Sequence, residues 1–317
     1  MRRTVALVLS LFVLAGASAC GGNHDKAGNA GSDKLANLKV TGKFASQPTV
    51  SVGKGVKVTK PVSEVISKGT GGVVQKDKYA LFQVDVVNGA TGKTAVSTYT
   101  QAPLSKQMSS TAFFASLVNA MVGQPKGSRI AVAAPVKSVW GTQDESSIGL
   151  KSADTAVFVI DILSVEPTDV LNAPGGTTVA PPASAPKVVE KSGVVTGIDW
   201  SKVPKKPPTK LTVIPLVKGD GPKAQAGSLV TFNYYGAVWG ANKAFDSSFS
   251  RGAPTPFAVG VHGLIPAWDN TIPGLARGSR VLIIAPPSTA YGSQAQQNIP
   301  ANSTLVFVVD ILGVDNS

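Results

Sequence analysis

Residues 245–268 of the chain read FDSSFSRGAPTPFAVGVHGLIPAW, and this stretch carries most of the information about the fold. Its last residue, Trp268, begins a series that continues at helical intervals with Ile272 and Leu275. Because proline ends a helix, Pro273-Gly274 limits this helix to about two turns. A short helix is therefore expected directly after the quoted stretch.

Strand patterns flank this helix on both sides. Upstream, Val230, Phe232 and Tyr234 alternate with polar residues, as expected of a half-buried strand. Downstream, residues 281–284 and 305–309 are continuous apolar runs rich in β-branched side chains, which is typical of buried strands. Together the patterns predict an α+β fold in which a curved antiparallel β-sheet wraps over one short α-helix.

The same pattern occurs twice along the chain of 317 residues, with an offset of about 150. The matching segments, each written with its partner, are 69–71 with 219–221, 127–130 with 278–281, 134–135 with 285–286, 140–141 with 291–292, and 157–163 with 306–312. Ordered matches at one offset indicate a tandem duplication. We predict a first domain at 38–166 and a second at 187–317, joined by a Pro/Ala-rich linker at 167–186 that cannot build a core.

The N-terminus resembles a bacterial lipoprotein signal. A basic start is followed by an apolar run at 5–14, which is shorter than the roughly 20 residues that span a bilayer, and by small residues at 15–19. Cys20, the one cysteine of the chain, comes next. The resemblance implies a signal peptide at 1–19, a lipid on Cys20 and a flexible tether at 20–37. The protein would then be exported and held at the extracytoplasmic face of the cell membrane, the alternative being a plain secretory signal with an incidental cysteine.

Charge and residue spacing exclude several classes of function. The formal net charge is +12, but the basic residues are dispersed, and this argues against a nucleic-acid partner. His24 and His262 have no metal-ligand partners nearby in sequence, and no serine has a histidine base at motif spacing. We therefore expect no metal, no cofactor and no serine hydrolase.

An ordered series of motifs in the second domain points to one family. The series, in chain order, is Gly219-Asp220-Gly221, Tyr234, Phe245-Asp246-Ser247-Ser248, Arg251-Gly252, Phe257-Ala258-Val259-Gly260, Leu264-Ile265, Trp268, Gly278, Pro286, Ala290-Tyr291-Gly292, Ile299-Pro300 and Leu305-Val306-Phe307. Its order and spacing resemble the FKBP-type peptidyl-prolyl cis-trans isomerases over about 100 residues. Both domains would then be FKBP-like.

The resemblance also implies a site. Trp268 would form the floor of a pocket, Tyr291 would donate a hydrogen bond to a ligand carbonyl, and Asp246 would be its one carboxylate. The catalytic residues would be Tyr234, Phe245, Asp246, Trp268 and Tyr291. The substrate-binding residues would be Phe257, Leu264, Ile265, Phe307 and Ile299, the last beside a backbone amide that also binds a ligand carbonyl.

Elementary chemistry agrees with such a pocket. Rotation about a peptide bond breaks amide resonance, and the barrier is about 18–20 kcal/mol. Amide resonance places negative charge on oxygen, where water stabilises it. A dry aromatic pocket withdraws that stabilisation and favours the twisted amide, so no nucleophile, metal or cofactor is required.

The first domain lacks the site residues. By the repeat offset, Phe245-Asp246 corresponds to Ala95-Val96, Tyr234 to Val84, Trp268 to Leu117, and Tyr291 to Trp140. We therefore predict a degenerate FKBP-like domain without isomerase activity.

The function expected from the sequence is peptidyl-prolyl cis-trans isomerisation by the C-terminal domain, assisting the folding of exported proteins. The partners would be X-Pro segments of those proteins, macrolides of the tacrolimus and rapamycin type, and the membrane through the lipid anchor. The alternative is a non-catalytic FKBP-like binding module, or a chaperone for unfolded segments.

Overall fold

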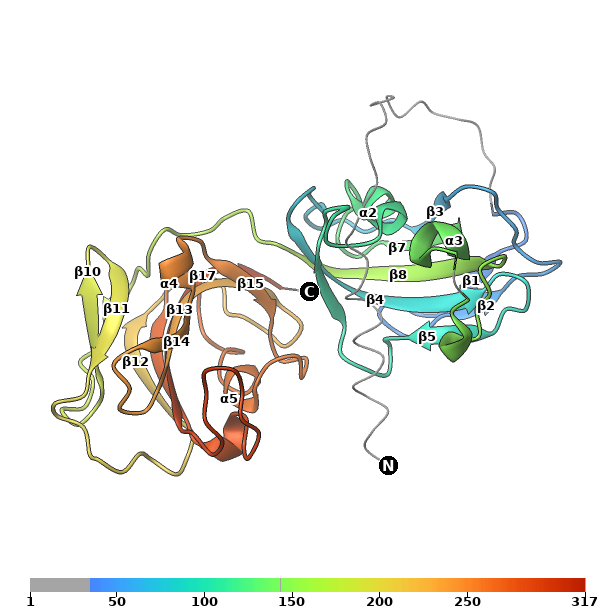
Figure 1. Cartoon of the computed structure of the whole chain (residues 1–317). Coiled ribbons are helices and arrows are strands. Elements are labelled where there is room, and N and C mark those ends of the chain that lie inside the picture. The colour runs from blue at the N-terminus through green and yellow to red at the C-terminus, as the bar shows by residue number, and fades with distance from the viewer. Residues whose placement is uncertain (1–34, 143, 317) are drawn as a thin grey trace. The chain divides into compact units, whose positions relative to one another are not determined.

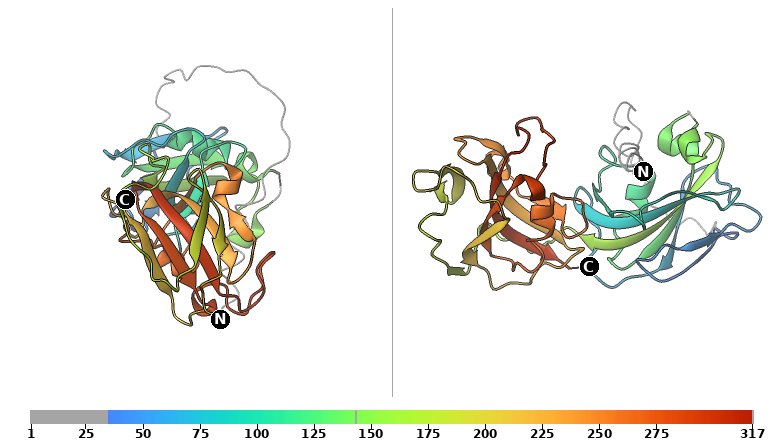
Figure 2. Two further views of the ribbon diagram at one scale, coloured as in Figure 1. Left: turned by 90° about the vertical axis from the view of Figure 1, so that its left-hand side faces the viewer. Right: turned by 90° about the horizontal axis from the view of Figure 1, so that it is seen from below.

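The computed structural model describes residues 35–142 and 144–316. The chain divides into two compact units, the first ending at Val165 and the second beginning at Glu166 (Figure 1). Each unit contains a twisted antiparallel sheet, visible from two further sides in Figure 2. The predicted α+β class with antiparallel sheets is confirmed. The predictions for residues 1–19 and Cys20 lie outside the described residues.

The second unit is built on one antiparallel sheet with the strand order β14-β13-β17-β16-β12-β9, and β15 also pairs with β13. Its strands are β9 (Thr177–Thr178), β12 (Thr212–Lys218), β13 (Leu229–Val238), β14 (Ala244–Ser247), β15 (Thr255–Ala258), β16 (Arg280–Ala285) and β17 (Leu305–Asp315). A separate hairpin consists of β10 (Lys187–Lys191) and β11 (Val194–Asp199). The helical segments are α4 (Ser248–Arg251), α5 (Pro266–Asp269) and the 3₁₀ turn η2 (Pro287–Thr289).

Strand β13 is buried on both faces, whereas its sequence pattern predicts burial on one. The inner face, with Val230, Phe232 and Tyr234, packs with Trp268 into the main core. The outer face forms a second apolar cluster with Val195 of the β10–β11 hairpin. The hairpin therefore covers the face that the alternation of apolar and polar residues predicted to be solvated.

Helix α5 is shorter than the two turns predicted. It spans only Pro266–Asp269, with Pro266 at the first helical position, where the fixed φ of proline is suitable. Turn hydrogen bonds continue beyond it, from Ile272 N–H to the Trp268 carbonyl at 2.9 Å and from Leu275 N–H to the Ile272 carbonyl at 3.0 Å. Trp268, Ile272 and Leu275 consequently still face one core.

Much of the stretch predicted as a Pro/Ala-rich linker pairs with the second unit. We call residues 167–179 the strap. Within it Leu171 N–H donates to the Leu312 carbonyl at 2.9 Å, Gly175 N–H to the Gly278 carbonyl at 3.0 Å, and Val179 N–H to the Leu216 carbonyl at 2.9 Å. Strand β9 of the strap pairs with β12, and Asp169 forms an ion pair with Arg277. Backbone pairing of this kind depends on partners distant in sequence, which is why composition alone did not reveal it.

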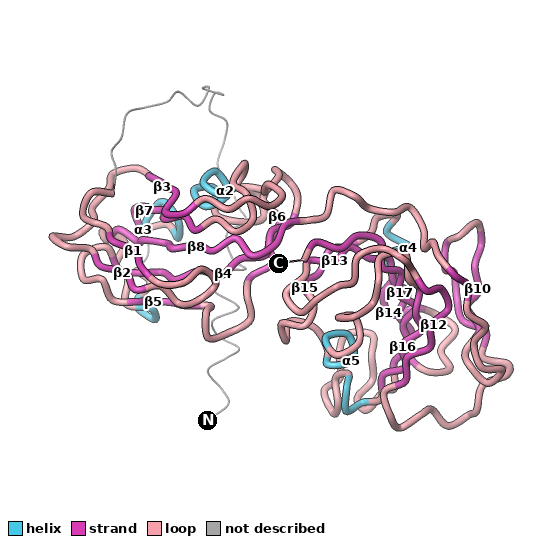
Figure 3. Tube along the Cα trace, turned by 180° about the vertical axis from the view of Figure 1, so that it is seen from behind, coloured by secondary structure: helices cyan, strands magenta, loops and turns pink. Residues whose placement is uncertain are grey.

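The first unit repeats this architecture. Its sheet has the order β3-β7-β8-β4-β5, with β6 also paired to β4 (Figure 3). The strands are β3 (Val62–Ser67), β4 (Tyr79–Asn88), β5 (Thr94–Ser97), β6 (Leu104–Gln107), β7 (Arg129–Pro135) and β8 (Thr155–Val165), with a β1 (Lys39–Thr41) and β2 (Thr49–Ser51) hairpin. The helical segments are α2 (Ala115–Met121), α3 (Val136–Trp140) and the 3₁₀ turn η1 (Ser146–Ile148).

The two units also share a buried ion pair between adjacent central strands. Arg129 on β7 pairs with Asp161 on β8, and Arg280 on β16 pairs with Asp310 on β17. In each unit the arginine also reaches the covering hairpin region, through the Gly42 carbonyl in the first unit and through Glu190 in the second. The repeated pair supports the duplication inferred from sequence. In the part of the chain that the structure describes, no helix is both long and apolar enough to cross a membrane.

Candidate active site

Side chains from several elements of the second unit line one cavity of about 470 Å³. They come from β13, β14, β15, α5, β17 and the loops before α5 and after η2. The lining residues are Tyr234, Phe245, Asp246, Phe257, Gly263, Leu264, Ile265, Pro266, Trp268, Ala290, Tyr291 and Phe307. The cavity is thus largely aromatic, with one carboxylate and two phenols.

Trp268 is the centre of the aromatic wall. The rings of Phe232, Tyr234, Phe257 and Phe307 stand nearly perpendicular to the indole, at 80–85°, with centroids 5.2–6.2 Å away. Edge-to-face contacts of this kind each contribute about 0.5–1.5 kcal/mol beyond the burial of area. The indole, only 5% exposed, is therefore held as a rigid floor.

A hydrogen-bonded triad forms the polar side of the cavity. The Tyr234 hydroxyl donates to Asp246 Oδ2, and Arg251 Nη1 donates to Asp246 Oδ1. Arg251 Nη2 also donates to the Tyr234 hydroxyl oxygen at 2.8 Å, and the guanidinium carbon lies 5.4 Å from the centre of the Tyr234 ring. Because Asp246 and Arg251 are each nearly half exposed, their ion pair contributes at most about 1 kcal/mol to stability. Its main effect is to fix the direction of the phenol.

The surroundings keep the phenols of the cavity protonated. Burial, followed by the hydrogen bond to Asp246, raises the pKa of Tyr234, while the hydrogen bond from Arg251 opposes this rise. The hydrogen bond to Tyr234 in turn raises the pKa of Arg251. Burial and the charge of Asp246 raise the pKa of Tyr291. The raised pKa values extend the pH range over which the two phenols stay neutral and the guanidinium stays charged.

Asp269 fixes the loop that forms one rim of the cavity. Its Oδ1 accepts a hydrogen bond from Gly260 N–H at 2.7 Å, and its Oδ2 accepts one from Leu264 N–H at 3.1 Å. The carboxylate stands next to Trp268 in α5 and is buried. It therefore ties the rim residue Leu264 to the same turn that presents the floor.

Gly236 on β13 makes room for the aromatic wall. A Cβ atom at this position would lie 2.7 Å from Phe245 Cζ and 3.1 Å from Phe307 Cε1. Phe245 and Phe307 pack edge to face, with centroids 5.7 Å apart and an interplanar angle of 86°. Only glycine leaves both rings in place here.

The structure brings all but one of the predicted catalytic and substrate-binding residues to this cavity, although their roles in catalysis stay predictions. The exception is Ile299, which is buried in the core. Its own N–H donates to the Gln296 carbonyl at 3.1 Å. Tyr291 is 39% exposed at the rim. No hydrogen bond of its hydroxyl is found within residues 35–142 and 144–316, so this donor is available to a ligand.

Comparison with known proteins supplies the family. The sequence profile of the FKBP-type peptidyl-prolyl cis-trans isomerases matches residues 221–312. The FK506-binding protein of Streptomyces anulatus is 36% identical over 110 residues, which cover 34% of this chain and 89% of that protein. The chain belongs to the FKBP-type peptidyl-prolyl cis-trans isomerase family. Peptidyl-prolyl isomerisation is accordingly its enzymatic activity.

Other FKBP proteins match over different shares of their length. The probable FK506-binding protein of Corynebacterium glutamicum is 33% identical over 105 residues, covering 33% of this chain and 87% of that protein. FkpA of Escherichia coli is 37% identical over 102 residues, which cover 32% of this chain and only 36% of FkpA. The crystal structure of FkpA aligns with a TM-score of 0.32 and 34% identity, over 35% of this chain and 51% of that chain.

Two polar residues of this FKBP site were not predicted. Arg251 was part of the family motif but was given no role, and Asp269 was not singled out. Both act through hydrogen bonds that join segments across a turn. Arg251 follows Asp246 by five residues, and the short helix α4 lies between them. This spacing was a signal in the sequence from which contact between the two side chains could have been predicted.

The first unit places different residues at the equivalent positions, and equivalent hydrogen bonds identify them. Val84 N–H and Tyr234 N–H each donate at 2.8 Å to a hydroxyl, that of Thr98 and that of Ser248 respectively. Likewise Leu117 N–H donates to the Phe114 carbonyl as Trp268 N–H donates to that of Ile265. Val96 pairs with Val86 as Asp246 pairs with Gly236. The predicted correspondences of Val84 with Tyr234, of Leu117 with Trp268 and of Val96 with Asp246 therefore hold in the fold.

In the first unit, aromatic side chains of the chain itself fill the space of the FKBP cavity. Phe82, Phe113, Phe114, Trp140 and Phe158 form a continuous series in which neighbouring ring centroids lie 5.2–5.6 Å apart. Trp140 stacks on Phe158 with an interplanar angle of 26°. Because Phe158 corresponds to Phe307, the ring of Trp140 covers the wall that faces the cavity in the second unit.

Proposed function

We propose that the second unit carries the isomerase activity and that the first unit does not turn over X-Pro bonds. The observation that supports this most directly is the contrast between the two equivalent places. One is an aromatic cavity with a carboxylate and two phenols. The other is packed with Phe113, Phe114 and Trp140 and has Val96 at the place of the carboxylate.

The chemistry of the cavity suits a twisted amide. The flat floor of Trp268 and the Phe245 and Phe307 rings offer an apolar slot for the proline ring. Entry of the amide into this slot removes water that stabilises its resonance form, which favours the twisted geometry. The hydroxyl of Tyr291 is placed to donate to a carbonyl of the bound chain. Asp246 and Arg251 orient the phenol of Tyr234. The dipole of this phenol sets the electric field on the side of the slot opposite Tyr291.

Substitution of matched positions in the full chain tests this assignment. Asp246→Ala should lower the rate of cis-trans exchange in an X-Pro peptide, measured by exchange NMR, by at least about tenfold. The equivalent variant Val96→Ala in the first unit should leave the rate unchanged. If the rate falls with Val96→Ala and not with Asp246→Ala, the assignment of the site to the second unit is wrong.

We further propose that the protein acts on exported chains while held at the extracytoplasmic face of the cell membrane by a lipid on Cys20. The support is the position of this cysteine after an apolar run and small residues. More than one acyl chain gives stable anchoring, whereas one alone is marginal. Cys20→Ser should move the mature protein from the membrane fraction to the soluble fraction. Recovery of the wild-type chain as a soluble, unacylated protein would refute the anchor without affecting the isomerase assignment.

A further inference from the structure

Among the residues that the structure describes, the outer edge of strand β3 in the first unit has no partner strand. β3 lies at one end of the sheet, and its partner among these residues is β7 (Figure 3). Across the described residues, no other strand runs beside it. Val65, in the middle of β3, is 41% exposed. An open edge of this kind can pair with another extended chain through its free backbone groups.

In the second unit, the equivalent edge is occupied. Strand β12 corresponds to β3, and β9 of the strap pairs with it through Thr178 opposite Val217 and Thr177 opposite Lys218. Gly175 N–H and Val179 N–H of the strap donate to the carbonyls of Gly278 and Leu216 at 3.0 and 2.9 Å. The molecule therefore shows what kind of segment this edge binds.

The groups that hold the strap are repeated in the first unit. Both edge strands have a bulge at the same place, between Pro215 and Val217 in β12 and between Val65 and Ser67 in β3. By this correspondence, the carbonyl of Ile66 takes the place of the Leu216 carbonyl, which accepts from Val179. In the second unit the bulge thus lies where the Leu216 carbonyl accepts from the strap, and the bulge in β3 places Ile66 at the equivalent position.

The glycines beside this edge are also repeated. Gly127 and Gly278 have φ angles of +87° and +92°, and a Cβ on either would lie 3.3–3.4 Å from the Cα of Gly69 or Gly219. Next to Gly278 the strap passes so close that a Cβ there would lie 2.4 Å from the Gly175 carbonyl oxygen. Within the described residues, no equivalent segment passes Gly127.

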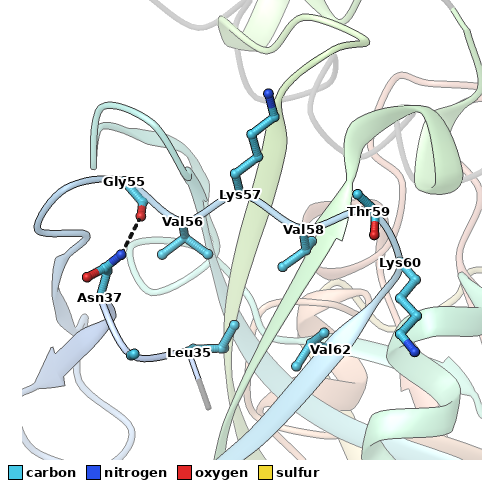
Figure 4. Close-up of a pocket in the computed structure, with 10 residues that line it drawn as sticks. Leu35, Asn37, Gly55, Val56, Lys57, Val58, Thr59, Lys60 and Val62 are labelled. Carbon is cyan, nitrogen blue, oxygen red and sulfur yellow. Dashed lines mark hydrogen bonds between the residues drawn. The ribbon is translucent and has the colours of Figure 1, made fainter. Parts of the chain in front are cut away.

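Two hollows flank the start of β3. One, of about 340 Å³, lies between residues 35–37 and 55–62. Figure 4 shows the side chains of Leu35, Val56, Val58 and Val62 directed toward one another there, while Lys57 and Lys60 point away. The other hollow, of about 450 Å³, is lined by residues of β3, β7, α2 and α3 and by Lys60 and Pro61 before β3. Both hollows lie at the start of β3, away from the end of the strand at which a segment paired like the strap would bind.

We propose that the edge of β3 binds an extended segment of a client polypeptide by strand addition. The strap defines the chemistry of that segment: two small residues followed by β-branched residues, as in Gly175-Gly176-Thr177-Thr178-Val179. Glycine is needed at the second position because a Cβ on Gly176 would lie 2.1 Å from the Lys218 carbonyl oxygen. Residues 175–179 also lie between Pro174 and Pro181, so this part of the strap resembles the X-Pro segments on which an isomerase acts. The identification of this segment as part of a client polypeptide rests on the proposed function. The strand pairing at the edge of β3 does not.

A proline-free peptide tests the edge in the full mature chain. The probe is the acetylated and amidated heptapeptide Ala-Gly-Gly-Thr-Thr-Val-Ala, which is not an isomerase substrate. Titration into isotope-labelled protein should shift the backbone amide signals of residues 62–72 and 126–128 in a saturable manner. A peptide with N-methylvaline at the valine position cannot donate to Ile66 and should bind at least about tenfold more weakly.

A variant pair on the protein side completes the test. In the second unit, the N–H of Lys218 faces β9. Lys68 is the equivalent residue in the first unit, and Lys68→Pro removes its N–H. This variant should abolish binding of the heptapeptide. Lys68→Ala retains this N–H and should bind normally, and both variants should keep the wild-type rate of X-Pro exchange. An unfolded, carboxymethylated polypeptide should compete with the heptapeptide at the same amides.

Three results would overturn the proposal. The first is the absence of saturable shifts at residues 62–72. The second is equal binding of the N-methylated peptide. The third is slow hydrogen exchange along the outer edge of β3 in the free protein, because this would show that the edge is already paired with the chain itself or with a second copy. An unchanged isomerase rate in the Asp246→Ala variant, by contrast, would refute only the proposed function.

Discussion

The phenol of Tyr234 lies between the carboxylate of Asp246 and the guanidinium of Arg251, and both partners affect its proton. The hydrogen bond to Asp246 stabilises the protonated phenol, whereas the hydrogen bond from Arg251 stabilises the phenolate. Burial, the largest effect, also favours the neutral form. The polarity of this side of the FKBP cavity therefore depends on three neighbouring side chains.

This arrangement predicts opposite effects of two substitutions on the titration of Tyr234. Asp246→Ala should lower the pKa of Tyr234, and Arg251→Ala should raise it further. Because the pKa is raised above its unfolded value of about 10, the phenol's contribution to stability is complete below that pH and is lost as the pH rises through the folded pKa. The ¹³Cζ signal of Tyr234, followed by NMR from about pH 8 to about pH 12, measures this pKa. Shifts of the same sign in both variants would contradict the account.

Gly236 offers a second test at the scale of one residue. Gly236→Ala should displace the Phe245 ring, lower the exchange rate and destabilise the second unit by about 1–3 kcal/mol. The measurements are X-Pro exchange NMR and denaturant unfolding. Gly175→Ala is a suitable control, since a Cβ there meets no atom within 4 Å. A wild-type exchange rate in the Gly236→Ala variant would show that Phe245 is not needed in its present position.

Most cavity residues could be predicted from the sequence because their function depends on the type of side chain. An aromatic floor, a lone carboxylate and rim phenols recur at fixed spacing in the family, so Trp268, Asp246 and Tyr291 could be placed from sequence. Asp269 could not, because its effect lies in two hydrogen bonds to backbone N–H groups of the rim loop. The same reason explains Ile299: only the fold shows that its N–H is already bonded to Gln296.

At the scale of elements, the strap changes how the second unit should be defined. A boundary at Lys187, as the composition suggests, would remove β9 and expose the edge of β12. It would also remove the partners of the Gly278, Leu216 and Leu312 carbonyls. Proline and alanine content predicts a linker correctly only when the segment finds no edge to pair with.

We therefore predict that a fragment of residues 187–317 is less stable than one of residues 166–317. Loss of three backbone hydrogen bonds and the β9 pairing should lower the free energy of unfolding by about 2–4 kcal/mol. The newly exposed edge should also increase self-association. Urea unfolding and light scattering of the two fragments provide the measurements. Equal free energies of unfolding for the two fragments would mean that the strap does not stabilise the second unit.

At the scale of the whole molecule, duplication has given two copies of one sheet with different interiors. The scaffold is retained in both, as the Arg129–Asp161 and Arg280–Asp310 pairs show. The sequence predicted that the first copy lacks the acid and the floor. It could not show that Phe113, Phe114 and Trp140 close the space, because the loss of site residues is compatible with either an empty or a filled cavity.

A filled first unit predicts a binding stoichiometry for the whole chain. If macrolides of the tacrolimus type bind to the cavity around Trp268, as the family resemblance implies, one molecule should bind per chain. Trp268→Ala should abolish this binding, because the ligand would lose the floor on which an apolar ring rests. Trp140→Ala should leave the stoichiometry at one, since Val96 and Val84 still stand where Asp246 and Tyr234 stand in the second unit. Isothermal titration calorimetry of the full chain measures both values. Two equivalent sites in the wild-type chain would show that the aromatic filling of the first unit opens to ligand, and residual binding in Trp268→Ala would place that second site there.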